Sequence, residues 1–468
     1  MIRIISQYLV LKTLIIVFIL LVLSNQKNNL YGDETGKRLN EISDPAIHII
    51  FTGEENGYLE PCGCSEKELG GFPRRHTLVN RLRKQDENWI LLSLGDLPGK
   101  ASRQDEIKME TALRALDQMN YTAHNIGEKD ISMGLGLLGY LSQISNVDFI
   151  SSNIDFNSQV LKVKPYIIKE VKIKETTLKV GILGILSPEL VDDVYQDIKV
   201  IDPLVSLKPL LSKLSDKTDI LILLSHAEIG DSVKIAENYP EFDLIISGHE
   251  IDEPGLHLTK VKNTYVIPVG EKGKYLGTVT ISPKYSRTDV DKLFNSYLPP
   301  VEIISLDDRV EESPEIAALL KTYQQRLRDE ELIKSMLKIY PPEDLSFTGN
   351  DVCAVCHNEI FKRWETTPHA SAYETLLKAE HEYDPECLQC HTIGLSYFTG
   401  FETIETTPEM KGVGCESCHG PGSNHNETQS KDYGKADIEI CETCHESEHS
   451  PNFQYEEYWK KIMHPLKE

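Results

Sequence analysis

The chain has 468 residues, of which 40% are hydrophobic and 26% are charged, a composition typical of folded proteins. This length exceeds what one hydrophobic core usually organises, so we expect more than one domain. The formal net charge of -24 argues against binding to nucleic acid, whose phosphates need basic residues, and it suits basic protein partners.

An apolar run near the N-terminus predicts export. The run TLIIVFILLVL, residues 13–23, follows Arg3 and Lys12 and is too short to cross a bilayer comfortably. A polar stretch follows it, with a cleavage point expected after Gly32. We therefore expect residues 1–32 to be a signal peptide and the rest of the chain to be periplasmic or otherwise extracytoplasmic. The alternative is an uncleaved anchor, which would limit membrane contact to this segment.

Short apolar runs alternate with amphipathic stretches in the first part of the chain. Amphipathic helices are expected at residues 105–119 and 203–214. This alternation predicts an α/β layered fold over residues 45–283, with functional side chains at the strand ends. The expected strands are IHIIFTG, WILLSLG, VDFISSN, LKVGILGI, DILILLSH, DLIISGH and TYVIPVG.

Polar motifs follow these strands in the order TGEENGYLEP, LGDLPG, IGEKD, LLSHAE and SGHEID. This order resembles the calcineurin-like metallophosphoesterase superfamily, in particular its 5′-nucleotidase branch. The resemblance implies an α/β metallophosphoesterase-like sandwich. It also exposes departures from the family pattern. Glu54 stands for the first aspartate, Asn56 for a histidine, Glu128 for a ligand asparagine, Lys129 for the leaving-group histidine and Ile251 for the last histidine.

These departures predict altered or lost hydrolysis, because two cations about 4 Å apart need a complete ligand set. The side chains that remain could hold one divalent metal ion, either a hard cation or zinc. The alternative is that they are only polar remnants of the scaffold. The candidate ligands are Glu54, Asp96, Glu128, His226 and His249.

Two cysteines, Cys62 and Cys64, lie beside the altered first motif and belong to no other cysteine pattern. A C-x-C pair can ligate a metal through thiolates or form an easily reduced disulfide, so we expect a functional pair and count both among the candidate metal ligands. Two separate buried thiols are the alternative. Arg74 and Arg75, which follow a glycine pair, could neutralise an anion.

Residues 284–346 are expected to form a linker. It contains a charged helical stretch at residues 313–337 and ends in a tyrosine and two prolines. A solvated spacer helix accounts for this composition.

The remaining cysteines form four C-x-x-C-H pentapeptides, the attachment sequence of c-type haem. In this sequence two thiols bind one porphyrin and the histidine ligates its iron. Zinc sites are the alternative, but zinc would not require a histidine after every second cysteine. The predicted attachment residues are Cys353, Cys356 and His357; Cys387, Cys390 and His391; Cys415, Cys418 and His419; and Cys441, Cys444 and His445.

We therefore expect four c-type haems in a mainly helical, loop-rich multihaem domain over residues 347–468. The segment has few aliphatic runs, so the porphyrins would supply most of its apolar interior. Further histidines outside the motifs could provide the sixth iron ligands. They are His369, His381, His425, His449 and His464.

Residues 348–464 also resemble the tetrahaem cytochrome c-554 family, including positions outside the haem motifs such as Trp364, Glu416 and Trp459. The resemblance implies three haems with two histidine ligands each and one haem with an open or weakly filled site. It implies that the distal ligands are His369, His425 and His464. His381 and His449 are left either as candidates for the fourth iron or as surface residues, and the motif spacing does not say which haem is open.

The leading hypothesis is electron transfer with redox partner proteins. In it the α/β domain serves docking or carries a modified redox site. Two alternatives remain: a metal-dependent, 5′-nucleotidase-like hydrolase fused to a cytochrome, and a multihaem oxidoreductase that acts on small nitrogen compounds at an open haem.

Overall fold

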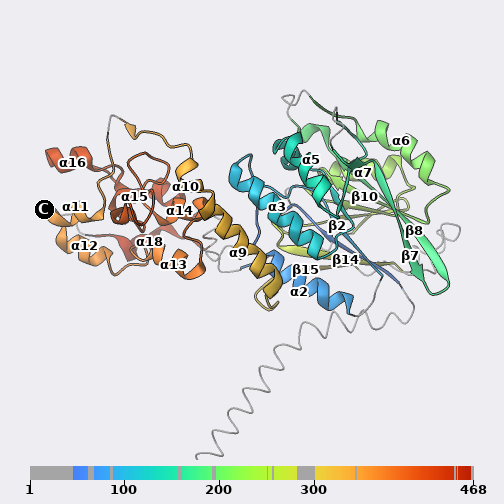
Figure 1. Ribbon diagram of the computed structural model, residues 1–468, viewed down its shortest axis with the longest axis horizontal. Coiled ribbons are helices and arrows are strands. Elements are labelled where there is room, and N and C mark those ends of the chain that lie inside the picture. The colour runs from blue at the N-terminus through green and yellow to red at the C-terminus, as the bar shows by residue number, and fades with distance from the viewer. Residues whose placement is uncertain are drawn as a thin grey trace, which may run out of the picture. The chain divides into compact units, whose positions relative to one another are not determined.

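The computed structural model divides into two compact units, each built from several chain segments (Figure 1). The sheet unit comprises Met1–Asn56, Leu69–Leu97 and Leu116–Glu312, and the helical unit comprises Gly57–Glu68, Pro98–Ala115 and Ser313–Glu468. The structure describes residues 46–61, 68–84, 88–156, 161–191, 197–249, 251–255, 258–281, 301–342, 345–446, 450 and 452–464. The predicted signal peptide, Cys62, Cys64 and His449 lie outside these residues.

Two large sheets form the sheet unit. The first has the order β15-β14-β1-β2-β3-β4-β6 and the second the order β12-β13-β11-β10-β8-β7. The first sheet consists of β1 (Ile47–Thr52), β2 (Trp89–Ser93), β3 (Ala123–Asn125), β4 (Asp148–Ile150), β6 (Val163–Lys164), β14 (Tyr275–Ile281) and β15 (Val301–Ser305). The second consists of β7 (Tyr166–Ile173), β8 (Thr176–Leu186), β10 (Ile220–His226), β11 (Leu244–Ser247), β12 (Thr259–Val261) and β13 (Thr264–Pro268), and a separate ribbon pairs β5 (Ile154–Phe156) with β9 (Ile198–Val200).

The core of the sheet unit follows from the two-residue period of its strands. Side chains of both sheets, among them Ile49 of β1 and Ile222 of β10, share one buried apolar cluster. Their neighbours Leu221 and Leu223 point to the opposite face and pack in a second cluster with Leu207 and Leu211 of α6 (Pro203–Leu214). The predicted α/β sandwich is confirmed.

Helices complete the sheet unit. Asp202 begins α6 by accepting a hydrogen bond from the Leu204 amide, and Pro203 occupies the first turn. The structure therefore has the helix that the sequence predicts at residues 203–214. The other helices are α2 (Phe72–Arg83), α4 (Glu128–Ser132), α5 (Leu135–Ile144), the short η1 (Pro188–Leu190) and α7 (Ile229–Asn238), while α3 (Arg103–Gln118) has its first thirteen residues in the helical unit.

The helical unit has a small protein core. Its buried apolar cluster consists of Ile333, Tyr373, Leu376, Leu388, Ile393, Leu395, Phe401 and Met410. Val355, inside the first C-x-x-C-H motif, is 82% exposed, which is costly for an apolar side chain unless something covers it. The helices are α9 (Pro314–Asp329), α10 (Leu332–Ser335), α11 (Asn350–Cys356), α12 (Asn358–Trp364), α13 (Ala372–Ala379), α14 (Pro385–His391), η4 (Pro408–Met410), α15 (Cys415–His419), α16 (Ser423–Thr428), α17 (Ile438–Glu442) and α18 (Tyr455–Ile462).

The expected spacer helix is packed rather than solvated. The structure ends α9 at Asp329 and buries one face of it, including Tyr323 and Gln324. Both side chains donate hydrogen bonds of 3.4 Å to Asp384, which also accepts one of 2.8 Å from Gln104 of α3. Because Asp384 caps α14, this buried network holds the second C-x-x-C-H motif against α3 and α9.

None of the helices in the described part of the chain combines the length and the apolar character needed to cross a bilayer.

Candidate functional site

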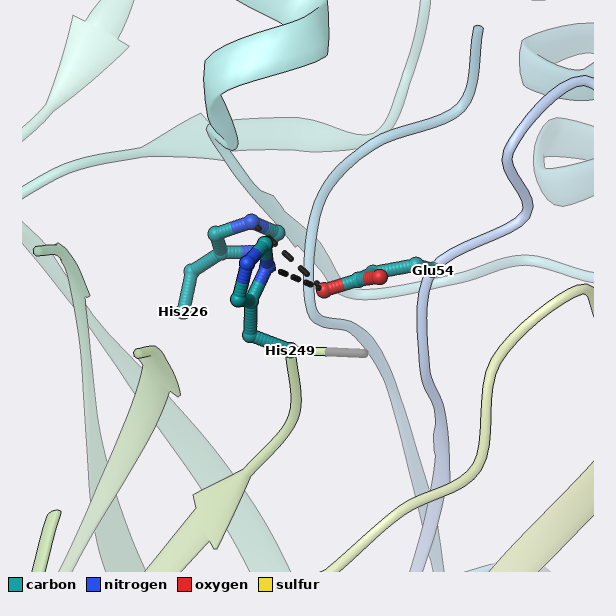
Figure 2. A group of neighbouring side chains, drawn as sticks. All are labelled: Glu54, His226 and His249. Carbon is teal, nitrogen blue, oxygen red and sulfur yellow. Dashed lines mark hydrogen bonds and ion pairs between the residues drawn. The ribbon is translucent and has the colours of Figure 1, made fainter. Parts of the chain in front are cut away.

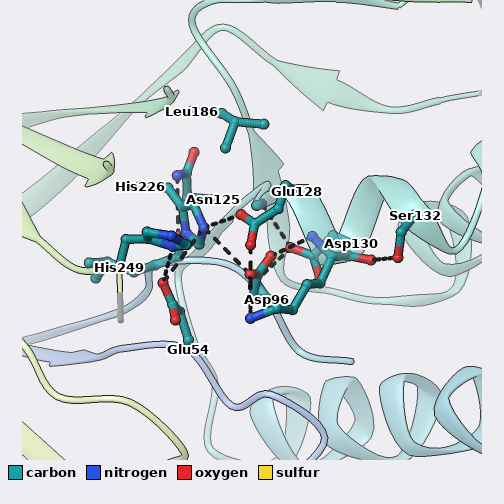
Figure 3. A network of polar contacts seen from close by, with 12 residues as sticks. Glu54, Asp96, Asn125, Glu128, Asp130, Ser132, Leu186, His226 and His249 are labelled. Carbon is teal, nitrogen blue, oxygen red and sulfur yellow. Dashed lines mark hydrogen bonds and ion pairs between the residues drawn. The ribbon is translucent and has the colours of Figure 1, made fainter. Parts of the chain in front are cut away.

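The sheet unit gathers the five predicted metal ligands at the ends of its parallel strands. Glu54 follows β1, Asp96 follows β2, Glu128 follows β3, His226 ends β10 and His249 follows β11. Because parallel strands end at one edge of a sheet, residues far apart in the chain meet there. Figure 3 shows all five in one polar network.

His226 is the centre of this network. Its Nδ1 donates to the Leu94 carbonyl at 3.1 Å, so its Nε2 faces the carboxylates. Nε2 lies 2.6 Å from Glu128 Oε2, 3.5 Å from Asp96 Oδ2 and 3.7 Å from Glu54 Oε1. Glu54 Oε1 is also 3.1 Å from His249 Nδ1, and both imidazole rings face this carboxylate (Figure 2).

The charges of the cluster depend strongly on one another. Burial lowers the pKa of His226, but the Asp96 and Glu128 carboxylates outweigh burial and raise it well above its usual value. Burial raises the pKa of Asp96. Burial also raises the pKa of Glu128, but the hydrogen bond from His226 reverses this effect and the net value is about 2. Without a metal, the imidazolium of His226 therefore supplies the positive charge that the carboxylates require.

Lys129 supplies a second positive charge. Its Nζ donates to Asn56 Oδ1 at 2.8 Å and lies 3.6 Å from Asp96 Oδ2 and 3.8 Å from Glu128 Oε1. Asn56 in turn donates to Glu54 Oε2 at 3.4 Å. Lys129 and Asn56 were identified in the sequence as departures from a family pattern, but not as members of the cluster. The structure brings both into it.

A buried pair behind the cluster was missed by the sequence analysis. Asp130 accepts hydrogen bonds from the amides of Asp96, Leu97 and Gly127 and lies 3.2 Å from His124 Nε2. Gly127 has no room for a side chain, because a Cβ there would lie 2.0 Å from Asp96 Oδ1. Asp130 thus fixes the backbone of the loops that present Asp96 and Glu128. Its place in the IGEKD motif was the only available signal.

The predicted anion site at Arg74 and Arg75 is wrong. Arg75 is fully buried and donates two hydrogen bonds to the Glu55 carboxylate, at 2.5 and 2.7 Å. Arg74 is also buried and donates to the Leu306 carbonyl. Both guanidinium groups hold the sheet unit together instead.

In the helical unit, histidines of the motifs meet histidines outside them. The ring centres are 6.0 Å apart for His357 and His425, 6.1 Å for His369 and His445, and 5.8 Å for His419 and His464. An iron bound on both sides by imidazole nitrogens at about 2 Å would hold the ring centres roughly 6 Å apart. The three pairs therefore fit haem iron, and each contains one of the predicted distal histidines.

Hydrogen bonds orient several of these rings for metal binding. When Nδ1 donates to an oxygen, Nε2 is left as the metal-binding atom and becomes more basic. The acceptors are the Ala372 carbonyl for His391 (2.7 Å), the Gly434 carbonyl for His419 (2.7 Å) and the Ser430 carbonyl for His425 (2.9 Å), and His445 Nδ1 lies 2.9 Å from the Ser450 hydroxyl.

One loop serves two of the pairs. In the loop formed by residues 430–434, the carbonyls of Ser430 and Gly434 hold His425 and His419. The Tyr433 ring stacks on His425 at 4.5 Å and contacts His419 at 6.0 Å. Gly434 has a φ of 33°, and a Cβ there would lie 2.1 Å from the His419 carbonyl oxygen. The loop therefore positions imidazoles of different pairs.

His391 differs from the other three motif histidines. In the described part of the chain it contacts no second imidazole, although its ring is oriented by Ala372. His381 is not available to it, because His381 Nε2 pairs with Glu60 Oε1 at 3.1 Å. The sequence left His381 either as a candidate ligand of the fourth iron or as a surface residue, and the structure pairs it with Glu60.

The motif cysteines are free of disulfides, as thioether bonds to haem require. The thiols of Cys353 and Cys415 interact, and so do those of Cys390 and Cys444. The first motif therefore lies beside the third, and the second beside the fourth.

Comparison with known proteins agrees with both units. Residues 352–420 match the family model "Cytochrome c554 and c-prime". The helical unit is cytochrome c-554-like. Cytochrome c-554 of Nitrosomonas europaea is 35% identical over 96 residues, which are 17% of this chain and 41% of that protein. This cytochrome resemblance supports c-type haem as the cofactor.

The sheet unit has different relatives. A 2′,3′-cyclic-nucleotide 2′-phosphodiesterase/3′-nucleotidase of Haemophilus influenzae is 24% identical over 238 residues, 44% of this chain and 36% of that protein. The chain thus spans less than half the length of both curated relatives. Two solved structures share the fold with a TM-score of 0.51 and 18% identity. They are a 5′-nucleotidase precursor from Thermus thermophilus, with 61% of this chain and 59% of that chain covered, and the NAD nucleotidase of Haemophilus influenzae, with 70% and 68% covered.

Proposed function

We propose that this protein is an exported electron carrier with four c-type haems in the helical unit. The three imidazole pairs near 6 Å carry the proposal, because each pair would bind one iron on both axial sides. A bound haem supplies a one-electron couple, and two fixed imidazoles keep both axial positions filled in either oxidation state. The chain's own residues then tune that couple through ring orientation and hydrogen bonding.

The partners of this carrier would be redox proteins with basic surfaces, since the chain carries a net charge of -24. The same charge argues against nucleic acid as a partner. Membrane contact is limited to residues 1–32, and only if that segment stays uncleaved.

A second proposed function concerns the second motif, Cys387, Cys390 and His391. Because no second imidazole contacts His391 in the described residues, this haem would have an open or weakly filled axial position. Such a position could bind a small nitrogen compound and make the protein an oxidoreductase. A high-spin ferric signal in the electron paramagnetic resonance spectrum of the oxidised protein would support this function, and four low-spin haems would leave the protein a carrier.

The proposal also covers the sheet unit, which has altered or lost hydrolase activity and holds at most one divalent cation. Its support is the ligand set itself: Lys129 and Asn56 occupy positions where a two-metal site needs further ligands. A metal-dependent phosphoesterase activity that disappears in Asp96→Ala would contradict this part and favour the hydrolase alternative.

The distal ligands give the sharpest test of the haem proposal. Protein made with a cytochrome c maturation system should contain four haems per chain by the pyridine haemochrome assay. His369→Ala, His425→Ala and His464→Ala should each keep four haems and convert one of them from low to high spin. The potential of that haem should rise, because loss of an imidazole disfavours the ferric state.

His381→Ala is the matched control, because its imidazole pairs with Glu60 rather than with another ring. It should leave the number of low-spin haems unchanged. Fewer than three haems per chain in the wild type, or distal variants with unchanged spin states, would overturn the assignment.

A further inference from the structure

We propose that the strand-end cluster of the sheet unit is a mononuclear transition-metal site, in which the Lys129 ammonium takes the place of a second cation. This inference rests on the proposed loss of two-metal hydrolysis and deepens it. It does not depend on the haems.

The first argument is that the cluster can serve only one ion. Two sets of ligand atoms lie within 4.8 Å of one another, Glu54 with His226 and His249, and Asp96 with Glu128 and His226. Both sets need His226. Its Nδ1 is bonded to the Leu94 carbonyl, so only the single lone pair of Nε2 remains. The two sets are therefore alternative descriptions of one site and not two neighbouring sites.

The second argument is an unsatisfied atom. Asp96 has no exposed surface, and its Oδ2 accepts no hydrogen bond among the described residues. Its charged neighbours, His226 and Lys129, lie beyond ordinary hydrogen-bonding distance, so a bound cation would give this buried oxygen a close partner. Asp96 Oδ2 lies 3.5 Å from His226 Nε2, inside the ring of ligands shown in Figure 3.

The third argument concerns Lys129. Its ammonium lies within 4 Å of the carboxylates of Asp96 and Glu128 and donates to Asn56. The ammonium would repel a divalent ion bound beside Asn56, because the two positive charges would lie close together. One divalent ion together with Lys129 balances the three carboxylates that face His226, whereas two divalent ions would leave an excess of positive charge.

The donor types indicate the class of metal. Two imidazoles with carboxylates suit first-row transition ions such as Mn²⁺, Fe²⁺ and Zn²⁺, whereas Mg²⁺ and Ca²⁺ prefer all-oxygen sites. We therefore expect Mn²⁺ to bind, Zn²⁺ to displace it, and excess Mg²⁺ to leave it bound.

Manganese is the probe for the test, because thiolates such as those of Cys62 and Cys64 bind it poorly. The full-length, haem-loaded protein is equilibrated with Mn²⁺, freed of excess by gel filtration, and analysed for manganese per chain by mass spectrometry. We expect one ion per chain and the electron paramagnetic resonance signal of an isolated Mn²⁺. His226→Ala and, separately, His249→Ala should bind none.

Lys129→Met is the decisive variant, because it removes the ammonium and keeps the side-chain length. It should still bind one ion, because His226 can serve only one, but a Mn²⁺ titration should show at least about tenfold tighter binding, because the repulsion by the ammonium is gone. Lys129→Arg keeps the charge and should bind one. Lys274→Met removes an ammonium that pairs instead with Asp252, and should also bind one.

Two manganese ions in the wild type or in Lys129→Met, none in the wild type, or an unchanged affinity in Lys129→Met would each overturn the inference. Far-UV circular dichroism and haem content identify any variant that fails to fold. If one of the two histidine variants does not fold, the other still tests the site. Phosphoesterase activity with only one bound ion would contradict the proposed loss of hydrolysis but would leave the mononuclear site standing.

Discussion

The two units differ in what supplies their interior. The sheet unit buries its own side chains between two sheets and under its helices, and its polar cluster occupies only the strand ends. The helical unit buries one small apolar cluster and leaves Val355 exposed inside a haem motif. A fold with its own core can lose metal ligands and persist. If haem supplies the interior of the helical unit, as proposed above, that unit has to keep the residues that attach haem.

The largest expected effect separates the units directly. Without haem attachment, the helical unit should unfold while the sheet unit stays folded, because only the latter has a sufficient protein core. Chain produced without a cytochrome c maturation system should therefore lose residues 345–464 to limited proteolysis at least about tenfold faster than the haem-loaded protein. Residues 116–281, which belong to the sheet unit, should stay resistant in both. A protease-resistant helical unit without haem would break the comparison.

The next effect tests how much the buried pair of Arg75 and Glu55 contributes to the stability of the sheet unit. Arg75→Met should destabilise it by about 3–5 kcal/mol, because Glu55 would remain buried without its partner. Denaturant unfolding followed by circular dichroism measures this loss. The double variant with Glu55→Gln should be less destabilised than Arg75→Met alone.

Arg81→Met is the control for this variant. Its guanidinium pairs with Glu311 on the surface, so its loss should cost less than about 1 kcal/mol. Equal effects of Arg75→Met and Arg81→Met would show that the buried pair does not support the fold.

The smallest effect concerns the pair of His381 and Glu60 in the helical unit. The hydrogen bond that His381 donates to the Glu60 carboxylate raises the pKa of His381. A raised pKa in the folded state stabilises the protein below the ordinary histidine pKa, and this stabilisation is lost as the pH rises through the raised value. His381→Gln should therefore lower the melting temperature at pH 5.5, by an amount equivalent to less than about 1 kcal/mol, and have no effect at pH 9. A deficit of the same size at both pH values would refute the ion-pair explanation.

The sequence predicted local features best. The strands and α6 follow from apolar periodicity. The five candidate ligands were named from the resemblance to the metallophosphoesterases, and they meet because parallel strands end at one edge of a sheet. The contacts of Lys129 could not be predicted, because its neighbour in the chain, Glu128, does not determine where a long ammonium side chain points. The burial of α9 could not be predicted either, because its charged composition is typical of a solvated helix. Its buried face depends on contacts with Asp384 and Gln104, which are distant in the sequence.

The histidine pairs are also contacts that the sequence alone could not predict. Spacing identifies the ligand behind each pair of cysteines, but partners such as His369 and His445 come together only through the fold. The distal histidines were therefore named by family resemblance and not from the spacing. His381 illustrates the converse, because its ion pair with Glu60 joins residues that no sequence pattern connects.

The loop of residues 430–434 restricts how this part of the chain can diverge. Its two ends are tied to different imidazoles, through the carbonyls of Ser430 and Gly434. An inserted or deleted residue could keep one of these two hydrogen bonds only by displacing the other. A side chain at position 434 would also collide with the His419 backbone. The loop should therefore tolerate changes of length as poorly as a C-x-x-C-H motif does, although it contains no iron ligand of its own.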